Sequence, residues 1–402
     1  MAEIQPRREG VGRREFVAGV AVAALPLAGT LLSNPAGAQN REAQHKNATS
    51  APGVIVRQND PDNLEYPFAN LDSFLTPNEQ FYVRNHFPVP EVDAKAWRLR
   101  VEGAVEHPFE IGYDELRKIS ARTVTALLEC SGNGRIRLKA PQVGIRWDQG
   151  GVGNAEWTGV PLSELLKRAG VKNGAVEVIL EGADKGKFDA PLAKSPGEIS
   201  FARSLTLSKA KQPEVLLAFE MNGAELTPDH GHPVRVIVPG WYGMASVKWL
   251  KRIVVAERPF QGYFQTFAYT VWERRDGLSH LTQVADLQVK SQIARPTRDE
   301  ILPAGSQFRI YGAAWTGEGQ VAKVEVSTDG GKQWTAAQLQ GKPVRYAWRL
   351  WAHQWSTPAK PGRYTVMARA TDDQGRVQPM ERDEDRRDAM ITHVEPIRVE
   401  VR

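Results

Sequence analysis

An apolar run at residues 123–129 ends abruptly at Cys130, and this junction constrains the chain more than any other stretch. The run predicts a buried strand, and a loop with two glycines follows it at residues 131–134, before Arg135. Cys130 is the single cysteine among 402 residues, so no disulfide can form within the chain. A free cysteine is most often a small buried hydrophobe. A thiol at a strand end, beside backbone that glycines leave open, is also well placed to meet a ligand.

Three further motifs accompany this junction along the chain. Residues 81–90 read FYVRNHFPVP, residues 229–240 read DHGHPVRVIVPG, and residues 246–250 read SVKWL. Together with LECSGNGR at residues 128–135, these motifs resemble the sulfite oxidase family of molybdenum enzymes in their order and approximate spacing. The resemblance covers about residues 64–400. Four linked motifs make it specific, where any one alone would be weak.

The overall composition is that of an ordinary globular protein, with 41% hydrophobic and 25% charged residues. The formal net charge is +5, and residues 1–38 contribute four Arg and three Glu to it. The remaining positive charge is mild and dispersed, without a basic stripe. We therefore expect no nucleic-acid partner.

The N-terminus has the pattern of an export signal. Residues 12–16 read GRREF, an apolar run follows at residues 17–32, and Ala-Gly-Ala ends at Ala38. The paired arginines before Phe16 favour the twin-arginine route to the periplasm. The apolar run is short for a membrane span, so we expect cleavage after Ala38 and no span in the mature protein. Residues 39–63 are polar and predict an arm or linker.

The rest of the chain divides into two regions that differ in their sequence pattern. Residues 64–284 mix short strands with a few helices, without the regular alternation of a doubly wound sheet, and predict an α+β domain. In residues 285–402, apolar and polar residues alternate between turns as in an all-β domain, with a hairpin turn at residues 328–332. This pattern predicts an immunoglobulin-like sandwich. The resemblance implies that the first is the molybdopterin-binding catalytic domain. It also implies that the second is a dimerisation domain, and hence a homodimer.

Arg84 and Arg135 are candidate ligands for sulfite, a small dianion that needs fixed positive charge. Without the resemblance, each would be an ordinary surface ion pair; the resemblance implies that both bind the anion. His86 lies two residues from Arg84, so on a strand both side chains would share one face. A nearby dianion would raise the pKa of His86, which would then act as a cationic donor or proton carrier. A hydrogen-bonded structural histidine is the alternative.

Tyr269 falls where the resemblance places the family's active-site tyrosine, whose phenol would donate to a metal-bound oxo group or to sulfite. Vertebrate members have an acidic residue just before this tyrosine, and here Ala268 stands there. Tyr263 or Tyr242 therefore remains an alternative counterpart. Trp147 matches an indole that walls the substrate pocket, and a plain core tryptophan is its alternative.

The resemblance assigns the remaining candidates to the molybdenum–molybdopterin cofactor. The Cys130 thiolate, a soft ligand, would hold an oxo-molybdenum centre together with the pterin dithiolene. His230 and Arg235 would bind the phosphate of the pterin, and His230 with His232 alone is weak evidence for zinc. Further cofactor contacts are expected from Tyr82, Val83, Asn85, Asp184, Ser246, Val247 and Lys248.

The expected activity is that of a periplasmic sulfite dehydrogenase, a catalytic subunit without haem. One cysteine cannot form the C-x-x-C-H motif of a c-type haem. Fewer than about thirty residues separate the signal from the pterin domain, too few for an N-terminal haem domain, and the C-terminal Glu-Val-Arg is no peroxisomal address. By elimination, we predict a separate c-type cytochrome as electron acceptor.

Three other functions remain open from the sequence. One is a sister molybdoenzyme, either a sulfane dehydrogenase subunit of a thiosulfate-oxidising complex or a sulfoxide reductase. Another is an exported adhesion or glycan-binding protein, which leaves the cysteine and the basic motifs unexplained. The third is a cysteine hydrolase, which needs His86 or His230 beside Cys130. Arg345 and Arg349 are available as a third substrate arginine from the C-terminal domain, but the sequence does not decide between them.

Overall fold

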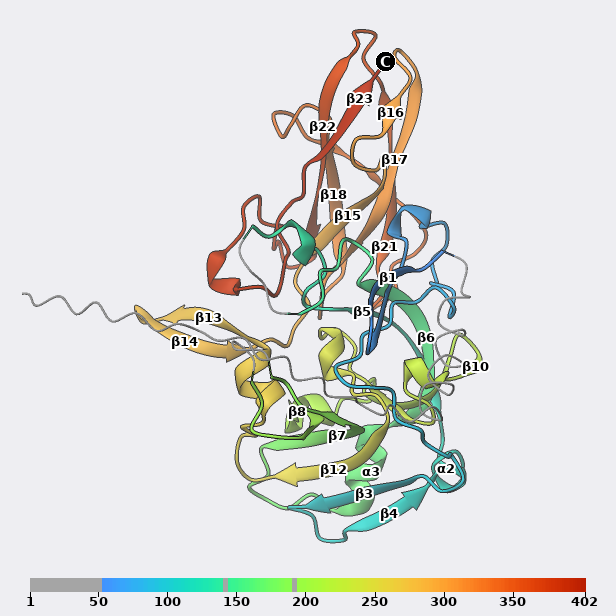
Figure 1. Cartoon of the computed structure of the whole chain (residues 1–402), viewed down its shortest axis with the longest axis vertical. Helices are drawn as coiled ribbons and strands as arrows, with labels where there is room; N and C mark the ends of the chain where they lie inside the picture. The colour runs from blue at the N-terminus through green and yellow to red at the C-terminus, as the bar shows by residue number, and fades with distance from the viewer. Residues whose placement is uncertain (1–52, 140–143, 190–193) are drawn as a thin grey trace, which may run out of the picture. The chain divides into compact units, whose positions relative to one another are not determined.

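The computed structural model describes residues 53–139, 144–189 and 194–402 (Figure 1). The predicted export signal and most of the predicted arm lie outside the described residues. The described part begins with an antiparallel hairpin, β1 (Ile55–Asn59) and β2 (Asp62–Glu65), where the sequence predicted a polar arm. The apolar pattern missed this hairpin because polar side chains hold it: the buried Asn63 amide donates to the carbonyl of Asn85 and accepts from its backbone N–H.

Two five-stranded sheets form the α+β region, as the sequence predicted. In the first sheet, the order is β10-β9-β6-β5, with β11 also paired to β9. In the second, the order is β4-β3-β12-β7-β8. The strands of the first sheet are β5 (Arg122–Glu129), β6 (Val152–Pro161), β9 (Leu216–Met221), β10 (Ala224–Glu225) and β11 (Arg235–Ile237). Those of the second are β3 (Arg98–Gly103), β4 (Phe109–Gly112), β7 (Glu177–Gly186), β8 (Ile199–Thr206) and β12 (Leu250–Ala256).

Helices are few and short in this region. Leu162, Leu165 and Leu166 of α3 share its buried face, and Gly170 ends the helix with a left-handed φ of 67° that favours glycine. The helices are α2 (Tyr113–Leu116), α3 (Leu162–Ala169) and α4 (Leu207–Ala210), with 3-10 turns η1 (Phe68–Asn70), η2 (Arg135–Arg137), η3 (Pro228–His230) and η4 (Gly243–Ala245). A further 3-10 turn, η6 (Glu384–Arg386), lies in the C-terminal region. In the described residues, no helix is long and apolar enough to cross a membrane.

The strand predicted before Cys130 is β5, and its second half is buried. It pairs antiparallel with β6, so that Glu129 lies opposite Val152. The strand ends because the chain turns at once: the Cys130 N–H donates to the carbonyl of Gly151 at 2.8 Å, and Gly134 has a φ of 98°. The thiol therefore stands at a strand end, as the sequence predicted.

The connection after β12 is rich in aromatic residues and has regular structure. It forms a π-helical turn, η5 (Tyr263–Ala268), followed by a hairpin of β13 (Thr270–Arg275) and β14 (Leu278–Gln283). Asp276 and Gly277, both with positive φ, make the two-residue turn, which is the signature of a tight hairpin. The predicted boundary between residues 284 and 285 falls between β14 and β15.

The C-terminal region is a sandwich of two sheets, which confirms the predicted fold class. The orders are β15-β17-β21-β20 and β16-β23-β22-β18-β19, and a core that includes Ile310, Val324 and Val366 lies between them. The first sheet consists of β15 (Lys290–Arg295), β17 (Gln307–Trp315), β20 (Gln338–Leu339) and β21 (Arg349–Ser356). The second consists of β16 (Ile301–Leu302), β18 (Val321–Ser327), β19 (Thr335–Ala336), β22 (Gly362–Asp372) and β23 (Ile397–Val401).

The long connection between β22 and β23 returns to the loop that follows Cys130. The Met390 N–H donates to the carbonyl of Ser131 at 2.7 Å, and Arg135 Nε donates to the carbonyl of Asp388 at 2.9 Å. Residues far apart in sequence thus fix the same loop.

Candidate active site

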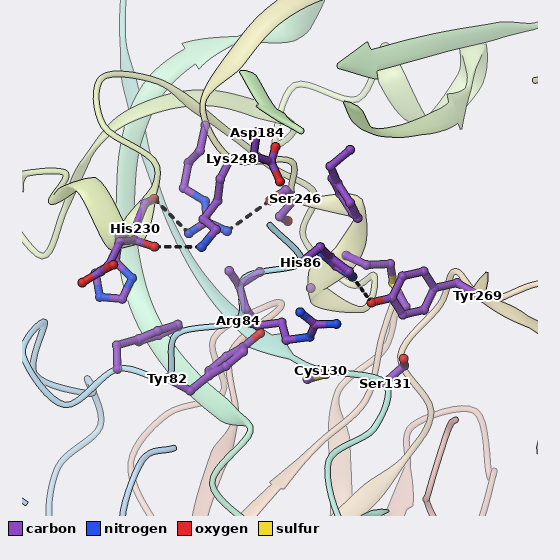
Figure 2. Close-up of a pocket in the computed structure, with 17 residues that line it drawn as sticks. Tyr82, Arg84, His86, Cys130, Ser131, Asp184, His230, Ser246, Lys248 and Tyr269 are labelled. Carbon is purple, nitrogen blue, oxygen red and sulfur yellow. Dashed lines mark hydrogen bonds between the residues drawn. The ribbon is translucent and has the colours of Figure 1, made fainter. Parts of the chain in front are cut away.

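A pocket opens at the end of β5 (Figure 2), and together with the solvent space at its mouth it holds about 650 Å³ that protein atoms do not fill. Ten of the fifteen predicted site residues line it: Tyr82, Arg84, His86, Cys130, Asp184, His230, Arg235, Ser246, Lys248 and Tyr269. The other five are buried without lining it: Val83, Asn85, Arg135, Trp147 and Val247. Residues as far apart in sequence as Tyr82 and Tyr269 therefore converge on one cavity.

Cys130 lies at the inner end of this pocket, with 7% of its surface exposed. Its backbone is fixed on both sides, since its N–H donates to Gly151 and its carbonyl accepts from the Asn133 N–H at 2.9 Å. In the described part of the chain, neither His86 nor His230 is hydrogen-bonded to the thiol; their ring nitrogens bond Tyr269 and Asn78 instead. The geometry of a cysteine hydrolase is therefore not assembled here.

His86 and Tyr269 form a pair beside the thiol. His86 Nε2 and the Tyr269 hydroxyl are hydrogen-bonded at 2.5 Å, and the imidazole stacks on Phe201 with ring centres 4.4 Å apart. Burial, and then the positive charges of Arg84 and other neighbouring cations, hold the pKa of His86 well below its usual value. The imidazole is thus neutral without an anion. The predicted rise of its pKa beside a bound dianion stays a prediction.

Tyr269 is the tyrosine of the three candidates that reaches this part of the pocket. Tyr263 packs on Phe188 with ring centres 5.7 Å apart, and Tyr242 is buried in the core; neither lines the cavity. Burial raises the pKa of Tyr269, so its phenol stays protonated and able to donate. Ala268 before it does not change this placement.

The two predicted substrate arginines differ in placement. Arg84 lies on a loop rather than a strand, lines the pocket, and donates to the carbonyl of Asn85. Arg135 does not line the pocket: it donates to the carbonyls of Ile145 and Asp388, each at 2.9 Å. It packs so closely under the loop that a Cβ at Gly132 would lie 2.3 Å from its guanidinium carbon. In this structure Arg84 is therefore the arginine that faces the cavity near Cys130.

Trp147 lies behind the pocket wall. It is fully buried, and its ring meets that of Tyr82 edge-on, with centres 6.1 Å apart. Tyr82, in contrast, lines the cavity. The predicted role of Trp147 as a wall of the substrate pocket stays a prediction, since here the indole supports Tyr82 from the rear.

A second group of polar side chains lines the opposite end of the pocket (Figure 2). Arg235 donates to the carbonyls of His230 and Ser246, both at 3.1 Å, and its guanidinium lies 5.0 Å from the ring centre of Trp157. His230 Nε2 is hydrogen-bonded to the carbonyl of Asn78 at 3.1 Å, which requires a proton on that nitrogen. Burial, followed by the charge of Arg235, lowers the pKa of His230 to about 3.

Lys248 and Asp184 complete this end. Lys248 Nζ donates to the carbonyl of Asp229 at 2.9 Å and to the side chain of Asn85. Burial, then the charge of Arg235, lowers the pKa of Lys248 to about 7, and burial raises the pKa of Asp184 to about 6. Both shifts favour the neutral forms, because the protein removes these groups from water without pairing them closely.

Three buried polar atoms that belong to pocket-lining residues have no hydrogen-bond partner in the described structure: Ser131 Oγ, Asp184 Oδ1 and Arg235 Nε. A buried donor or acceptor without a partner costs roughly 1–3 kcal/mol, and nearly all such groups in folded proteins are satisfied. A polar ligand that fills the cavity would satisfy them. The donors and acceptors at this end, together with a thiol at the other, fit a phosphorylated pterin that carries a metal.

The sequence did not predict Arg203, a fully buried arginine on β8. It donates to the carbonyls of Phe264 and Val284, at 2.5 and 2.9 Å, on either side of Tyr269 in the sequence. Its guanidinium lies 5.8 Å from the ring centre of Tyr269. Arg203 thereby fixes the segment that carries Tyr269. The one signal for Arg203 in the sequence was that a charged residue stands within a strand of mostly buried residues.

Arg345 and Arg349 do not serve the site. Arg345 pairs with Glu318 at 3.4 Å, and Arg349 donates to the carbonyls of Gln340 and Gly341. Neither lines the pocket.

Replacing His230 should change how stability depends on pH. The pKa of His230 is lower in the folded state than in the unfolded chain, so the unfolded state binds more protons between about pH 6.5 and pH 3. The stabilisation is present above pH 6.5 and is lost as the pH falls. We expect cofactor-free His230→Gln, which keeps an N–H donor but does not titrate, to lose less free energy of unfolding from pH 7 to pH 5 than the wild type. Urea unfolding at each pH measures the free energy of unfolding. An equal loss of that free energy from pH 7 to pH 5 in the variant and the wild type would contradict the prediction.

Removing the Arg203 guanidinium should destabilise the protein by roughly 2–4 kcal/mol, because Arg203→Met leaves two buried carbonyls without donors. Arg203→Lys offers one donor nitrogen in place of the two that reach the separate carbonyls, and should lose about half as much. Denaturant unfolding of the two variants and the wild type tests this. An Arg203→Met variant as stable as the wild type would show that the carbonyls find other donors.

Comparison with known families agrees with the geometry of the pocket. Residues 86–264 match the oxidoreductase molybdopterin binding domain, and residues 282–391 match the Mo-co oxidoreductase dimerisation domain. The first match spans the loop of His86, the Cys130 junction and the SVKWL motif. The second lies in the sandwich.

Individual relatives match over most of the chain. Sulfite oxidase of Gallus gallus is 38% identical over 347 residues, which cover 82% of this chain and 73% of that protein. Mitochondrial sulfite oxidase of Homo sapiens is 35% identical over 347 residues, and the chain spans 62% of its length. The crystal structure of the sulfane dehydrogenase SoxCD from Paracoccus pantotrophus is similar over 85% of each chain, with a TM-score of 0.73 and 29% identity. The chain therefore belongs to the sulfite oxidase family of molybdenum oxidoreductases, as its motifs predicted.

Proposed function

We propose that this protein is a sulfite dehydrogenase that oxidises sulfite to sulfate with the molybdenum cofactor. The observation that carries the proposal is the convergence of the Cys130 thiol, the Arg84 guanidinium and the His86–Tyr269 pair on one cavity. The relatives named sulfite oxidase support the choice of substrate.

Residues at the two ends of the pocket would hold different parts of the cofactor. Cys130, as a thiolate, would ligate the metal, since a soft ligand suits molybdenum and must lose its proton to bind. Arg235, His230 and Lys248 would bind the phosphorylated pterin, and the unpaired Oδ1 of Asp184 would accept from its ring. When bound, the cofactor supplies a metal centre that transfers an oxygen atom and takes up two electrons.

The residues beside Cys130 would then bind the substrate and carry protons. Arg84 offers a positive charge that does not titrate, and it would hold the sulfite dianion against the metal end of the cavity. The neutral His86 would become cationic beside that dianion, because an opposite charge favours the protonated form. Its Nε2 would exchange a proton with the Tyr269 hydroxyl, which lies 2.5 Å away, as water supplies the fourth oxygen of sulfate.

We also propose a location, an oligomeric state and an electron acceptor for the enzyme. The Arg13–Arg14 pair and the apolar run after it support export to the periplasm by the twin-arginine route. The dimerisation family match supports a homodimer through residues 285–402, with residues 64–284 as the catalytic domain. A chain with one cysteine cannot attach a c-type haem by itself. We therefore assign the two electrons to a separate c-type cytochrome.

A sulfane dehydrogenase is the second candidate, because the SoxCD structure is similar over 85% of both chains. Since Arg135 is turned away from the cavity, Arg84 alone carries the argument for a small anion over a sulfoxide. Steady-state rates with sulfite, thiosulfate and methionine sulfoxide separate the candidates. Sulfite should give the highest kcat/KM, and a higher value for thiosulfate would favour the second candidate.

Replacing the thiol should abolish turnover without unfolding the protein. We expect Cys130→Ser to lose at least about 100-fold in kcat, since even partners outside the metal's ligand set cost about 10–100-fold when removed. Its melting temperature should stay near that of Thr123→Ser, a control on the exposed part of β5. Molybdenum content, melting and sulfite oxidation are measured together. Wild-type activity in Cys130→Ser would refute the role of the thiol.

The electron acceptor can be tested on the purified enzyme. With sulfite in excess, we expect cytochrome c to be reduced much faster than oxygen is consumed, because we assign the two electrons to a c-type cytochrome. Stopped-flow absorbance and an oxygen electrode give the two initial rates. Equal rates would show that the enzyme is an oxidase.

A further inference from the structure

The residue before Cys130 is a buried carboxylate that the proposed mechanism does not use. Glu129 is 1% exposed and its side chain points away from the pocket that Cys130 lines. Its Oε1 accepts from Lys290 Nζ at 2.8 Å and from Asn133 Nδ2 at 3.1 Å, and its Oε2 accepts from Trp315 Nε1 at 2.9 Å. Lys290 lies on β15 and Trp315 on β17, so both cross-domain donors come from the sandwich.

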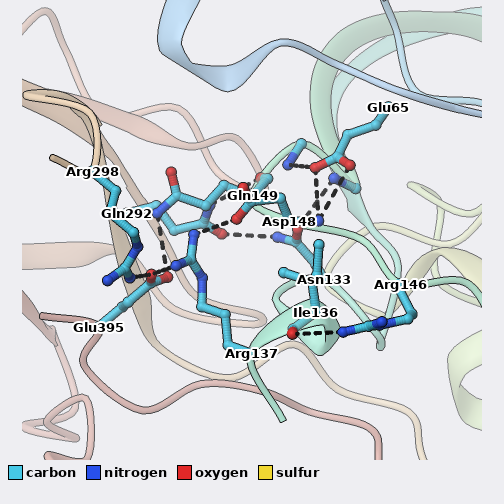
Figure 3. Close-up of polar contacts among 12 residues, drawn as sticks. Glu65, Asn133, Ile136, Arg137, Arg146, Asp148, Gln149, Gln292, Arg298 and Glu395 are labelled. Atoms are coloured by element: carbon cyan, nitrogen blue, oxygen red, sulfur yellow. Dashed lines mark hydrogen bonds and ion pairs between the residues drawn. The ribbon is translucent and has the colours of Figure 1, made fainter. Parts of the chain in front are cut away.

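The loop that follows Cys130 is fixed by the same sheet (Figure 3). Asn133 Nδ2 donates to Gln292 Oε1 at 2.8 Å, and Lys290 Nζ also donates to the carbonyl of Asn133 at 3.3 Å. Gln292 in turn donates to the carbonyl of Gln149 at 2.9 Å, next to the glycines whose backbone meets Cys130. Asn133 Oδ1 accepts from the Gly151 N–H at 3.1 Å.

A second anchor lies a few residues further on (Figure 3). Arg137, on η2, is ion-paired with Asp148 and with Glu395. Glu395 also accepts from Arg298 at 2.6 Å. Both ends of the segment from Glu129 to Arg137 are therefore tied to the C-terminal region, and Cys130 lies between them.

Burying a charge pair this deeply is unfavourable unless the geometry is good, and an apolar pair of the same volume often stabilises a fold as well. Lys290, like Glu129, is almost fully buried, with 5% of its surface exposed. The Lys290–Glu129 pair therefore does more than join two domains. Lys290 neutralises a carboxylate that would otherwise repel an anionic thiolate and an anionic substrate, and it fixes the end of β5 in one position.

We propose that Glu129 and Lys290 are positioning residues, through which the C-terminal sandwich fixes the orientation of the Cys130 thiol toward the cofactor. This inference rests on the proposed role of Cys130 as the metal ligand. It gives the sandwich a function in the active site of its own chain, in addition to dimerisation.

The holoenzyme offers a direct test, because Cys130 is the only thiol that a cysteine reagent can modify. Lys290→Met and Glu129→Gln should raise the rate of modification of Cys130 by about tenfold, as the strand end opens more readily. Molybdenum release should rise in parallel. The kcat should fall by about 10²-fold, the cost of a small misplacement at a reacting centre, while KM changes little.

Lys209→Met is the matched control. Lys209 is also 5% exposed, pairs with Glu318 of the sandwich at 2.6 Å, and lies outside the pocket. The Lys209→Met variant should be less stable than the wild type, but its Cys130 should be modified at the wild-type rate. If Lys290→Met and Glu129→Gln, folded and loaded with molybdenum, react at the wild-type rate, or if Lys209→Met reacts as fast as they do, the proposal is wrong.

The test of the positioning role does not depend on which substrate the enzyme oxidises. If thiosulfate proves the better substrate, protection of Cys130 still tests the positioning role. If Cys130→Ser retains molybdenum and turnover, the metal-ligand role fails first, and the modification rates then report only the local packing of the strand end.

Discussion

The hydrogen bond from the Cys130 N–H to the carbonyl of Gly151 is the contact on which the site depends. It ends β5 at a fixed point and directs the Cys130 thiol into the pocket, while the Glu129 carboxylate points the other way, into the interface with the sandwich. Alternation along a strand produces this division, because neighbouring side chains point to opposite faces. One residue therefore faces the pocket and the next faces the sandwich, so a one-residue slip in β5 would exchange them.

The pocket combines many positive groups with few negative ones. Arg84, Arg235, Lys248 and Arg203 all lie at or beside it, and Asp184 is the acidic group whose pKa is raised toward neutrality. Burial first, and then repulsion from the charge of Arg235, lowers the pKa values of Lys248 and His230. An anionic ligand would relieve that repulsion, since opposite charge favours the charged forms. The charge distribution of this pocket would thus favour phosphate and oxyanion groups.

The sequence predicted the architecture well because hydrophobic period and turn residues are local signals. The strand before Cys130, the α+β region and the sandwich followed from them. The hairpin from Thr270 to Gln283 was missed although Asp276 and Gly277 mark its turn, because exposed Trp272, Leu278 and Leu281 blur the alternation. The hairpin from Ile55 to Glu65 was missed for the opposite reason, since Asn63 holds it through hydrogen bonds that no apolar pattern reveals.

For the site, sequence motifs predicted which residues converge but not which way each side chain points. Arg84 and Arg135 were equivalent as charges, and only the tertiary structure distinguishes them: two backbone carbonyls, one of them from the loop before β23, turn Arg135 away from the cavity. The same loop contacts Ser131 through Met390, and β15 contacts Glu129 through Lys290. The C-terminal region thus fixes the cysteine loop at several points. Because those partners lie more than 150 residues from Cys130, no local pattern could reveal them.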